Sequence, residues 1–134
     1  MRLMERWSPI RAHAEWIALL RESLYGQGPL TPAMASDEEQ CELGQWLKER
    51  KPFYGHLAEY QVVEQVHHEF HRHATHCLQL ANSGRRAEAI AEAGENSELR
   101  RLSRQLVKML QRLKHEVAHK EAADSAWRTE DRPG

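Results

Sequence analysis

Apolar side chains recur every three or four positions between residues 58 and 82 of this 134-residue chain. The stripe consists of Tyr60, Val63, His67, Phe70, Ala74, Cys77 or Leu78, and Ala81. Such steps place side chains on one face of an α-helix, which repeats about every 3.6 residues. Ser83-Gly84 is a typical helix stop. The pattern predicts a helix of about 25 residues whose buried face contains His67, with His71 beside it.

A second helical stripe lies near the start of the chain. Ser8 and Pro9 are typical of a helix entrance, with serine as the N-cap and proline at the first helical position. The helix is expected to run to about Tyr25, ahead of a loop that contains glycine and proline. Its apolar stripe consists of Ile10, His13, Ile17, Leu20 and Leu24. This register turns His13 toward the core.

A shorter helix is predicted between these two. Ser36 followed by Glu39 has the spacing of a capping box, in which the serine side chain caps the helix and the glutamate returns the bond. The helix is expected to end at about Glu49, before a break at residues 52–55. Cys41 then lies within its first two turns.

The C-terminal part of the chain predicts one more long helix. Its stripe consists of Leu99, Leu102, Leu106, Met109, Leu113 and Val117. The sequence leaves open whether Gly94 separates this helix from a helical stretch at residues 85–93. Residues 1–120 are expected to form one domain and residues 121–134 a disordered tail.

These stripes predict an all-α fold, an antiparallel four-helix bundle with an additional short helix that carries the cysteine. Hydrophobic residues make up 40% of the chain and charged residues 29%, as in an ordinary globular protein. The formal charge of -1 removes the electrostatic basis for binding nucleic acid or an anionic membrane. We find no apolar run of about 18 residues and no signal peptide, so a cytoplasmic protein is expected.

Four residues combine into a candidate metal site: His13, Cys41, His67 and His71. His67 and His71 lie one helical turn apart, so both imidazoles can bind one ion. Without a metal, several buried imidazoles would need partners, and each unpaired one costs roughly 1 to 3 kcal/mol. Nitrogen and sulfur donors favour Zn²⁺ over Mg²⁺ or Ca²⁺. Four protein ligands leave no place for a water nucleophile, so the site predicts a structural or sensory metal and no enzyme.

Three alternatives stay open. Residues 115–119, His-Glu-Val-Ala-His, spell the motif of zinc peptidases, but the stripe through Leu113 and Val117 turns both histidines toward solvent. A di-iron bundle of the hemerythrin kind also uses inward histidines, yet it needs bridging carboxylates, for which Glu69 supplies no matching second motif. The third is a metal-free interaction bundle.

The candidate ligands lie in three short motifs. Residues 13–16 read His-Ala-Glu-Trp, residues 41–46 read Cys-Glu-Leu-Gly-Gln-Trp, and residues 67–71 read His-His-Glu-Phe-His. Intervals of 24 and 20 residues separate them. This arrangement resembles the chemoreceptor zinc-binding domain family, whose members carry H-x-x-aromatic, C-x-hydrophobic-G-x-aromatic and H-x-x-x-H. The resemblance extends from about Trp7 to Leu113.

The resemblance implies specific roles for these residues. It makes His13, Cys41, His67 and His71 the zinc ligands, and it makes Trp16, Leu43, Gly44 and Trp46 their structural neighbours. It also implies a homodimeric bacterial helical bundle that regulates chemoreceptors or diguanylate cyclases in chemotaxis and related signal transduction. The stimulus that the resemblance implies is zinc or an oxidant such as hypochlorous acid, which would make the Cys41–zinc pair a candidate for redox sensing.

The sequence shows no heptad array of a methyl-accepting module and no cyclase-sized second domain. The expected function is therefore that of a stand-alone zinc-binding regulatory domain that acts on a signalling partner in trans. Met1 favours a free-standing protein over a fragment.

Overall fold

The computed structural model describes the backbone of residues 9–130 and the side chains of residues 9–123. Within these residues the fold is all-α, without a strand. The elements are α1 (Pro9–Leu24), α2 (Pro32–Ser36), the 3₁₀ turn η2 (Glu38–Gln40), α3 (Glu42–Tyr54), α4 (Ala58–Asn82), α5 (Arg86–Glu92) and α6 (Glu98–Glu130). Ser8, the predicted N-cap of α1, lies outside the described residues.

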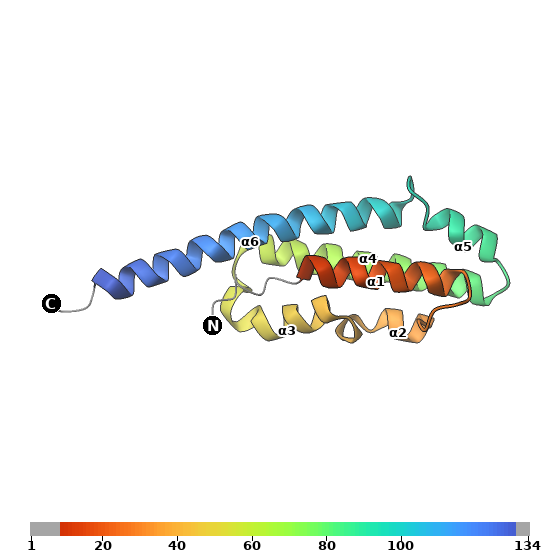
Figure 1. Cartoon of the computed structure of the whole chain (residues 1–134), viewed down its shortest axis with the longest axis horizontal. Coiled ribbons are helices and arrows are strands. Elements are labelled where there is room, and N and C mark those ends of the chain that lie inside the picture. The colour runs from red at the N-terminus through yellow and green to blue at the C-terminus, as the bar shows by residue number, and fades with distance from the viewer. Residues whose placement is uncertain (1–8, 131–134) are drawn as a thin grey trace.

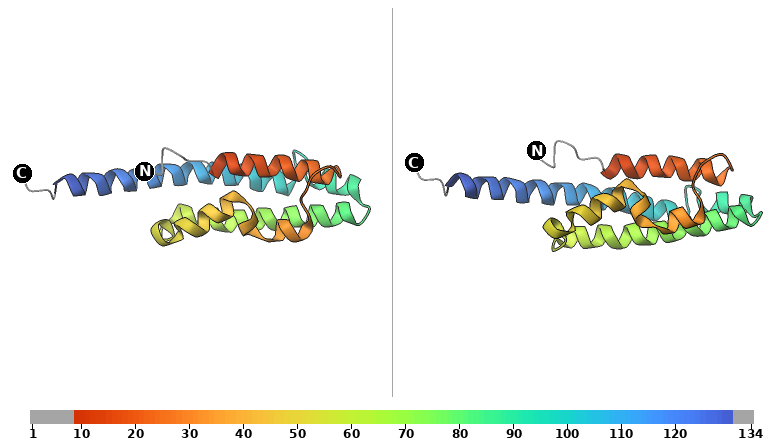
Figure 2. Two further views of the ribbon diagram at one scale, coloured as in Figure 1. Left: turned by 60° about the horizontal axis from the view of Figure 1, so that its bottom comes forward. Right: turned by 90° about the horizontal axis from the view of Figure 1, so that it is seen from below.

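The long helices α1, α4 and α6 run side by side, and α2 and α3 complete the bundle beneath α1 and α4 (Figure 1). Successive long helices, α1, α3, α4 and α6, run in opposite directions (Figures 1 and 2). The predicted all-α antiparallel bundle is therefore confirmed. Among the described residues, no helix combines the length and the apolar character that crossing a bilayer requires.

Helix α4 forms the centre of the core. Every stripe position predicted for it is buried, from Tyr60 to Ala81, and His71 is buried as well. The hydroxyl of Tyr60 donates a hydrogen bond to the backbone oxygen of Leu47, which ties α4 to α3. The helix ends where predicted, because Gly84 adopts a positive φ of 80° that few other residues tolerate.

The segment before α3 differs from the prediction. Ser36 does not cap a helix; it is the last residue of α2, and its hydroxyl donates to the oxygen of Ala33. Thr31 caps α2, Asp37 caps η2, and the Cys41 sulfur caps α3. The predicted short helix is therefore two short elements followed by α3, which continues through Pro52 to Tyr54.

The end of the chain answers the question that the sequence left open at Gly94 and otherwise differs from the prediction. Helix α5 ends at Glu92 and α6 begins at Glu98, so Gly94 lies between two helices. Leu110 is fully buried, whereas Met109 of the predicted stripe is half-buried. Helix α6 continues to Glu130, through most of the predicted tail, and runs past the other helices (Figures 1 and 2). Residues 121–130 are rich in alanine and glutamate, which favour a helix.

Candidate metal centre

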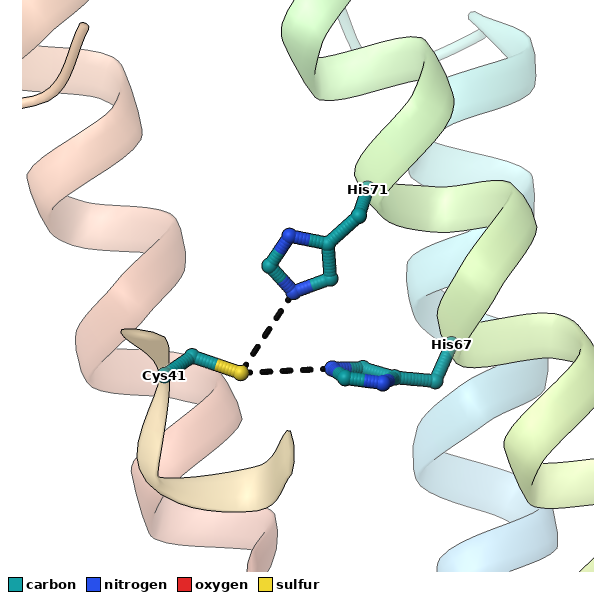
Figure 3. Close-up of side chains that lie close together, drawn as sticks. All are labelled: Cys41, His67 and His71. Atoms are coloured by element: carbon teal, nitrogen blue, oxygen red, sulfur yellow. Dashed lines mark hydrogen bonds between the residues drawn. The ribbon is translucent and has the colours of Figure 1, made fainter. Parts of the chain in front are cut away.

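Three of the four candidate ligands converge in the interior (Figure 3). Cys41 comes from the N-cap of α3, and His67 and His71 come from successive turns of α4. The sulfur of Cys41 lies 3.2 Å from Nε2 of His67 and 3.4 Å from Nε2 of His71. All three side chains are buried. The two imidazoles therefore face one sulfur atom in the interior of the bundle.

The contacts of the two Nδ1 atoms show which nitrogen of each imidazole carries the proton. Nδ1 of His71 lies 2.8 Å from the backbone oxygen of Ala35, which only accepts hydrogen bonds, so Nδ1 carries the proton. Nδ1 of His67 faces a carboxylate oxygen of Glu38 at 3.5 Å, which favours the same tautomer. In neutral rings of this tautomer, both Nε2 atoms present a lone pair to the Cys41 sulfur.

Burial keeps these imidazoles neutral. It lowers the pKa of His67 to about 3, with additional repulsion from His71, His13 and His68. Burial also lowers the pKa of His71, although its bond to the Ala35 oxygen opposes the shift. At neutral pH the cluster thus contains two lone pairs and a thiol with a single proton. That proton satisfies only one imidazole, and an unsatisfied buried acceptor costs about 1 to 3 kcal/mol.

The donor separations fit a zinc ion. In a tetrahedral site, Zn–S bonds of about 2.3 Å and Zn–N bonds of about 2.0 Å place sulfur and nitrogen about 3.5 Å apart. The separations of 3.2 and 3.4 Å are close to this value. One sulfur and two imidazole nitrogens are soft donors, which disfavours Mg²⁺ and Ca²⁺. The cluster therefore fits a zinc-binding domain.

The Cys41 sulfur lies at the start of a helix. The backbone N–H of Gly44 donates to it at 3.3 Å, and the backbone oxygen of Glu38 lies at the same distance. Burial raises the pKa of the thiol, while hydrogen bonds from the N–H groups of Gly44 and Leu43 work in the opposite direction. The thiol is thus protonated on its own, and a bound zinc ion would hold it as the thiolate.

Gly44 allows the chain to pass close to the sulfur. A Cβ atom at this position would lie 1.7 Å from the backbone oxygen of Glu38. No side chain fits in this space, so the position requires glycine for close approach rather than for an unusual φ. Trp16, another expected neighbour, is buried with its ring centroid 4.6 Å from that of His71.

His13, the fourth candidate ligand, lies outside the three-residue cluster. It is buried on α1, its Nε2 lies 3.0 Å from the hydroxyl of Ser103 on α6, and its ring packs against Phe70. Its pKa falls to about 4, first because of burial and second because of repulsion from His71. The structure thus brings three candidates together and holds the fourth nearby, neutral and bonded to a hydroxyl.

Sequence reasoning missed the outer partners of the cluster. The Ala35 oxygen and the Glu38 carboxylate orient the two imidazoles of α4, and Ser103 binds His13. None of these belongs to a recognisable motif. Ala35 and Glu38 could have been suspected only because they shortly precede Cys41 in the sequence. Nothing in the sequence points to Ser103.

The residues that the zinc-peptidase and di-iron alternatives require do not form such a site among the described residues. His115, Glu116 and His119 are exposed on α6, as predicted, and they join no cluster of potential ligands among the described residues. The cluster of Cys41, His67 and His71, found among the described residues, contains no carboxylate. A di-iron centre uses carboxylates as bridges. Cys77 is buried in α4, where burial and Glu92 raise its pKa to about 11.

Comparison with known proteins agrees with this geometry. Searches of curated proteins and of solved structures find no match. Residues 13–78 match the family described as the chemoreceptor zinc-binding domain. The matched segment begins at His13 and includes Cys41, His67 and His71. Through this segment, the chain belongs to the chemoreceptor zinc-binding domain family.

Proposed function

We propose that this chain is a zinc-dependent sensory domain that holds one Zn²⁺ through Cys41, His67, His71 and His13. The observation that carries the proposal is the pair of imidazole nitrogens directed at one sulfur, at separations suited to zinc. His13 is the proposed fourth ligand because it is a buried imidazole close enough to His71 for repulsion between their protonated forms to lower its pKa. Four protein ligands leave no open position for a substrate, so the proposed role is regulatory and not catalytic.

Metal content tests this proposal directly. Protein purified without an affinity tag should contain one zinc per chain, and Cys41→Ser and His67→Ala should each bind it far more weakly. Cys77→Ser is the matched control, since Cys77 is also a buried cysteine but lies outside the cluster. A wild-type protein that takes up no zinc, or iron in place of zinc, would refute the proposal.

The proposed switch is the sulfur of Cys41. Zinc supplies the thiolate form, which is the form that oxidants attack. Hypochlorous acid transfers its oxygen: thiolate and HOCl give the sulfenic acid and chloride, so sulfur loses two electrons and chlorine gains them. The sulfenic acid is a poorer zinc ligand, and its formation releases the N-terminus of α3 from α4. The same movement follows when zinc itself is lost.

Oxidation of the two cysteines tests the switch. With a sub-stoichiometric amount of hypochlorous acid, Cys41 in the zinc-loaded protein should be modified first, as detected by peptide mass spectrometry. After zinc removal, the rate of Cys41 oxidation relative to the other residues should fall, because burial raises the pKa of the free thiol. Modification of Cys77 or Met109 ahead of Cys41 would contradict the switch while leaving the zinc site intact.

The proposed output is a signalling partner in trans, of the chemoreceptor or diguanylate cyclase type, reached as a homodimer in the cytoplasm. The family name links such domains to chemoreceptors. Light scattering on the zinc-loaded protein tests the dimer, and a monomer at micromolar concentration would contradict it.

A further inference from the structure

Two open hollows in the surface are each lined in part by a residue of the metal cluster. The first, of about 470 Å³, is lined mainly by residues of η2 and α3, and His67 is part of its lining. The second, of about 450 Å³, is lined mainly by residues of α4, and His71 is part of its lining. Ser36 and Glu38 line both. Glu38 therefore borders both of the hollows that contain a candidate ligand in their lining.

The carboxylate of Glu38 connects an exposed imidazole with a buried one. Its Oε2 lies 2.7 Å from Nδ1 of His68, and its Oε1 lies 3.5 Å from Nδ1 of His67. The side chain of His68 is 61% exposed, that of Glu38 is 33% exposed, and that of His67 is 3% exposed. These three side chains thus connect the surface with the outer nitrogen of His67, whose other nitrogen faces the Cys41 sulfur.

The first hollow has an acidic lining. Asp37, Glu38, Glu39 and Glu64 contribute four carboxylates, against the two ammonium groups of Lys48 and Lys51. Each lysine already lies close to a carboxylate, at 3.3 Å from Glu39 and at 3.5 Å from Glu64. The remaining negative charge attracts cations toward Glu38. In the second hollow, the guanidinium of Arg72 is paired with Glu69.

We propose that Glu38 and His68 form an outer metal-exchange site through which zinc enters and leaves the cluster. The inference rests on the proposed zinc function. A carboxylate and an imidazole are both zinc ligands, and a site with only two protein ligands binds weakly enough to release the ion inward. Metal binding at Nδ1 displaces the proton that this atom shares with Oε2. By way of water, the proton moves to Nε2 of the neutral His68 ring, and it returns to Nδ1 when the ion moves on.

Exchange kinetics test the site. Zinc uptake and its release to a colour-forming chelator are followed by stopped-flow absorbance for wild type and His68→Ala. Both rates should fall by about tenfold in the variant. The dissociation constant should change far less than the rates, because His68 is not a proposed ligand and its side chain is hydrogen-bonded to Glu38. Glu38→Gln should slow exchange as well and also weaken binding, since Glu38 contacts His67.

His76→Ala is the matched control. His76 is an exposed histidine on the same helix, lines the second hollow and is paired with a different carboxylate, that of Glu92. The His76→Ala variant should exchange zinc at the wild-type rate. An unchanged rate in His68→Ala, or an equal slowing in both variants, would overturn the exchange site and leave the zinc function standing. Absence of zinc binding by the wild type would instead refute the proposed function itself.

Discussion

Helices α4 and α6 each contain a pair of histidines four residues apart, His67 with His71 and His115 with His119. The pair on α4 is buried, faces the Cys41 sulfur and has hydrogen-bond acceptors behind both rings. The pair on α6 is exposed and joins no ligand cluster among the described residues. Spacing thus places two imidazoles on one face, but a third donor and outer partners distinguish the candidate metal site.

Helix register explains the difference. His67 lies four residues after Val63 and three before Phe70, both of them fully buried, so it shares their face. His115 lies two residues after the buried Leu113, a rotation of about 200° that carries it to the opposite side of the helix. The same spacing of histidines therefore gives a buried or a solvated pair, according to its position relative to the apolar stripe of the helix.

Removal of zinc should give the largest difference between the two pairs. Chelation of the loaded protein should lower the melting temperature by an amount on the order of 15 °C, since a ligand at about 1,000 times its dissociation constant contributes about 4 kcal/mol. Differential scanning calorimetry measures it. His115→Ala/His119→Ala should show the same drop as wild type, and His67→Ala should show almost none. Equal drops in both variants would contradict the assignment.

Loss of a single ligand should rank next. His71→Ala should weaken zinc binding several hundred-fold, about 3 to 4 kcal/mol, as a share of the roughly 10 to 16 kcal/mol of a structural zinc site. His119→Ala should bind like wild type. Competition with a chelator of known affinity measures both. If His119→Ala weakened binding as much as His71→Ala, the site would have to include α6.

Much of α4 could be predicted because helix burial leaves a regular signal in the sequence. Each predicted stripe position is buried, and the glycine stop at residue 84 has the positive φ that ends the helix. Helix α6 was harder, because its last turns have no apolar stripe and their composition is compatible with either a helix or a tail.

The segment around the cysteine could not be predicted in detail. Thr31, Ser36, Asp37 and Cys41 all have side chains that can cap a helix, and only the folded chain shows that Ser36 does not. The contacts of the site are also long-range: His71 meets Ala35 across 36 residues, and His13 meets Ser103 across 90. Such pairings arise from packing and leave no local pattern.

A glycine substitution would show whether the buried pair depends on its surroundings. Gly44→Ala should displace the segment at Glu38, because the new Cβ would lie 1.7 Å from a backbone oxygen. We expect zinc affinity to fall by about 10- to 100-fold, the range for lost outer partners. Gly94→Ala is the control, since its nearest contact is 3.1 Å and it lies between α5 and α6. Equal affinities in the two variants would contradict this role of Gly44.

Acid should destabilise the metal-free protein through its buried histidines. The unfolded chain takes up protons as the pH falls past 6.5, whereas folded His13 and His67 stay neutral until about pH 4 and 3. The free energy of unfolding is therefore highest above pH 6.5, and it decreases as the pH falls toward the pKa values of about 4 and about 3 in the folded protein. At pH 5 the loss is about 2 kcal/mol for each histidine.

Urea unfolding of the chelated protein at pH 7 and pH 5 measures this loss. In His67→Leu the pH dependence should be smaller by about 2 kcal/mol, while His115→Ala should retain the wild-type dependence. A dependence unchanged in His67→Leu would show that this imidazole is not buried in the neutral form.

The coordination of the metal tests the central claim most directly. X-ray absorption at the zinc edge of the loaded, untagged protein should show one sulfur at about 2.3 Å together with nitrogen at about 2.0 Å. The sulfur shell should disappear in Cys41→Ser and persist in Cys77→Ser. A wild-type spectrum with nitrogen and oxygen neighbours but no sulfur would contradict a zinc site built on Cys41, His67 and His71.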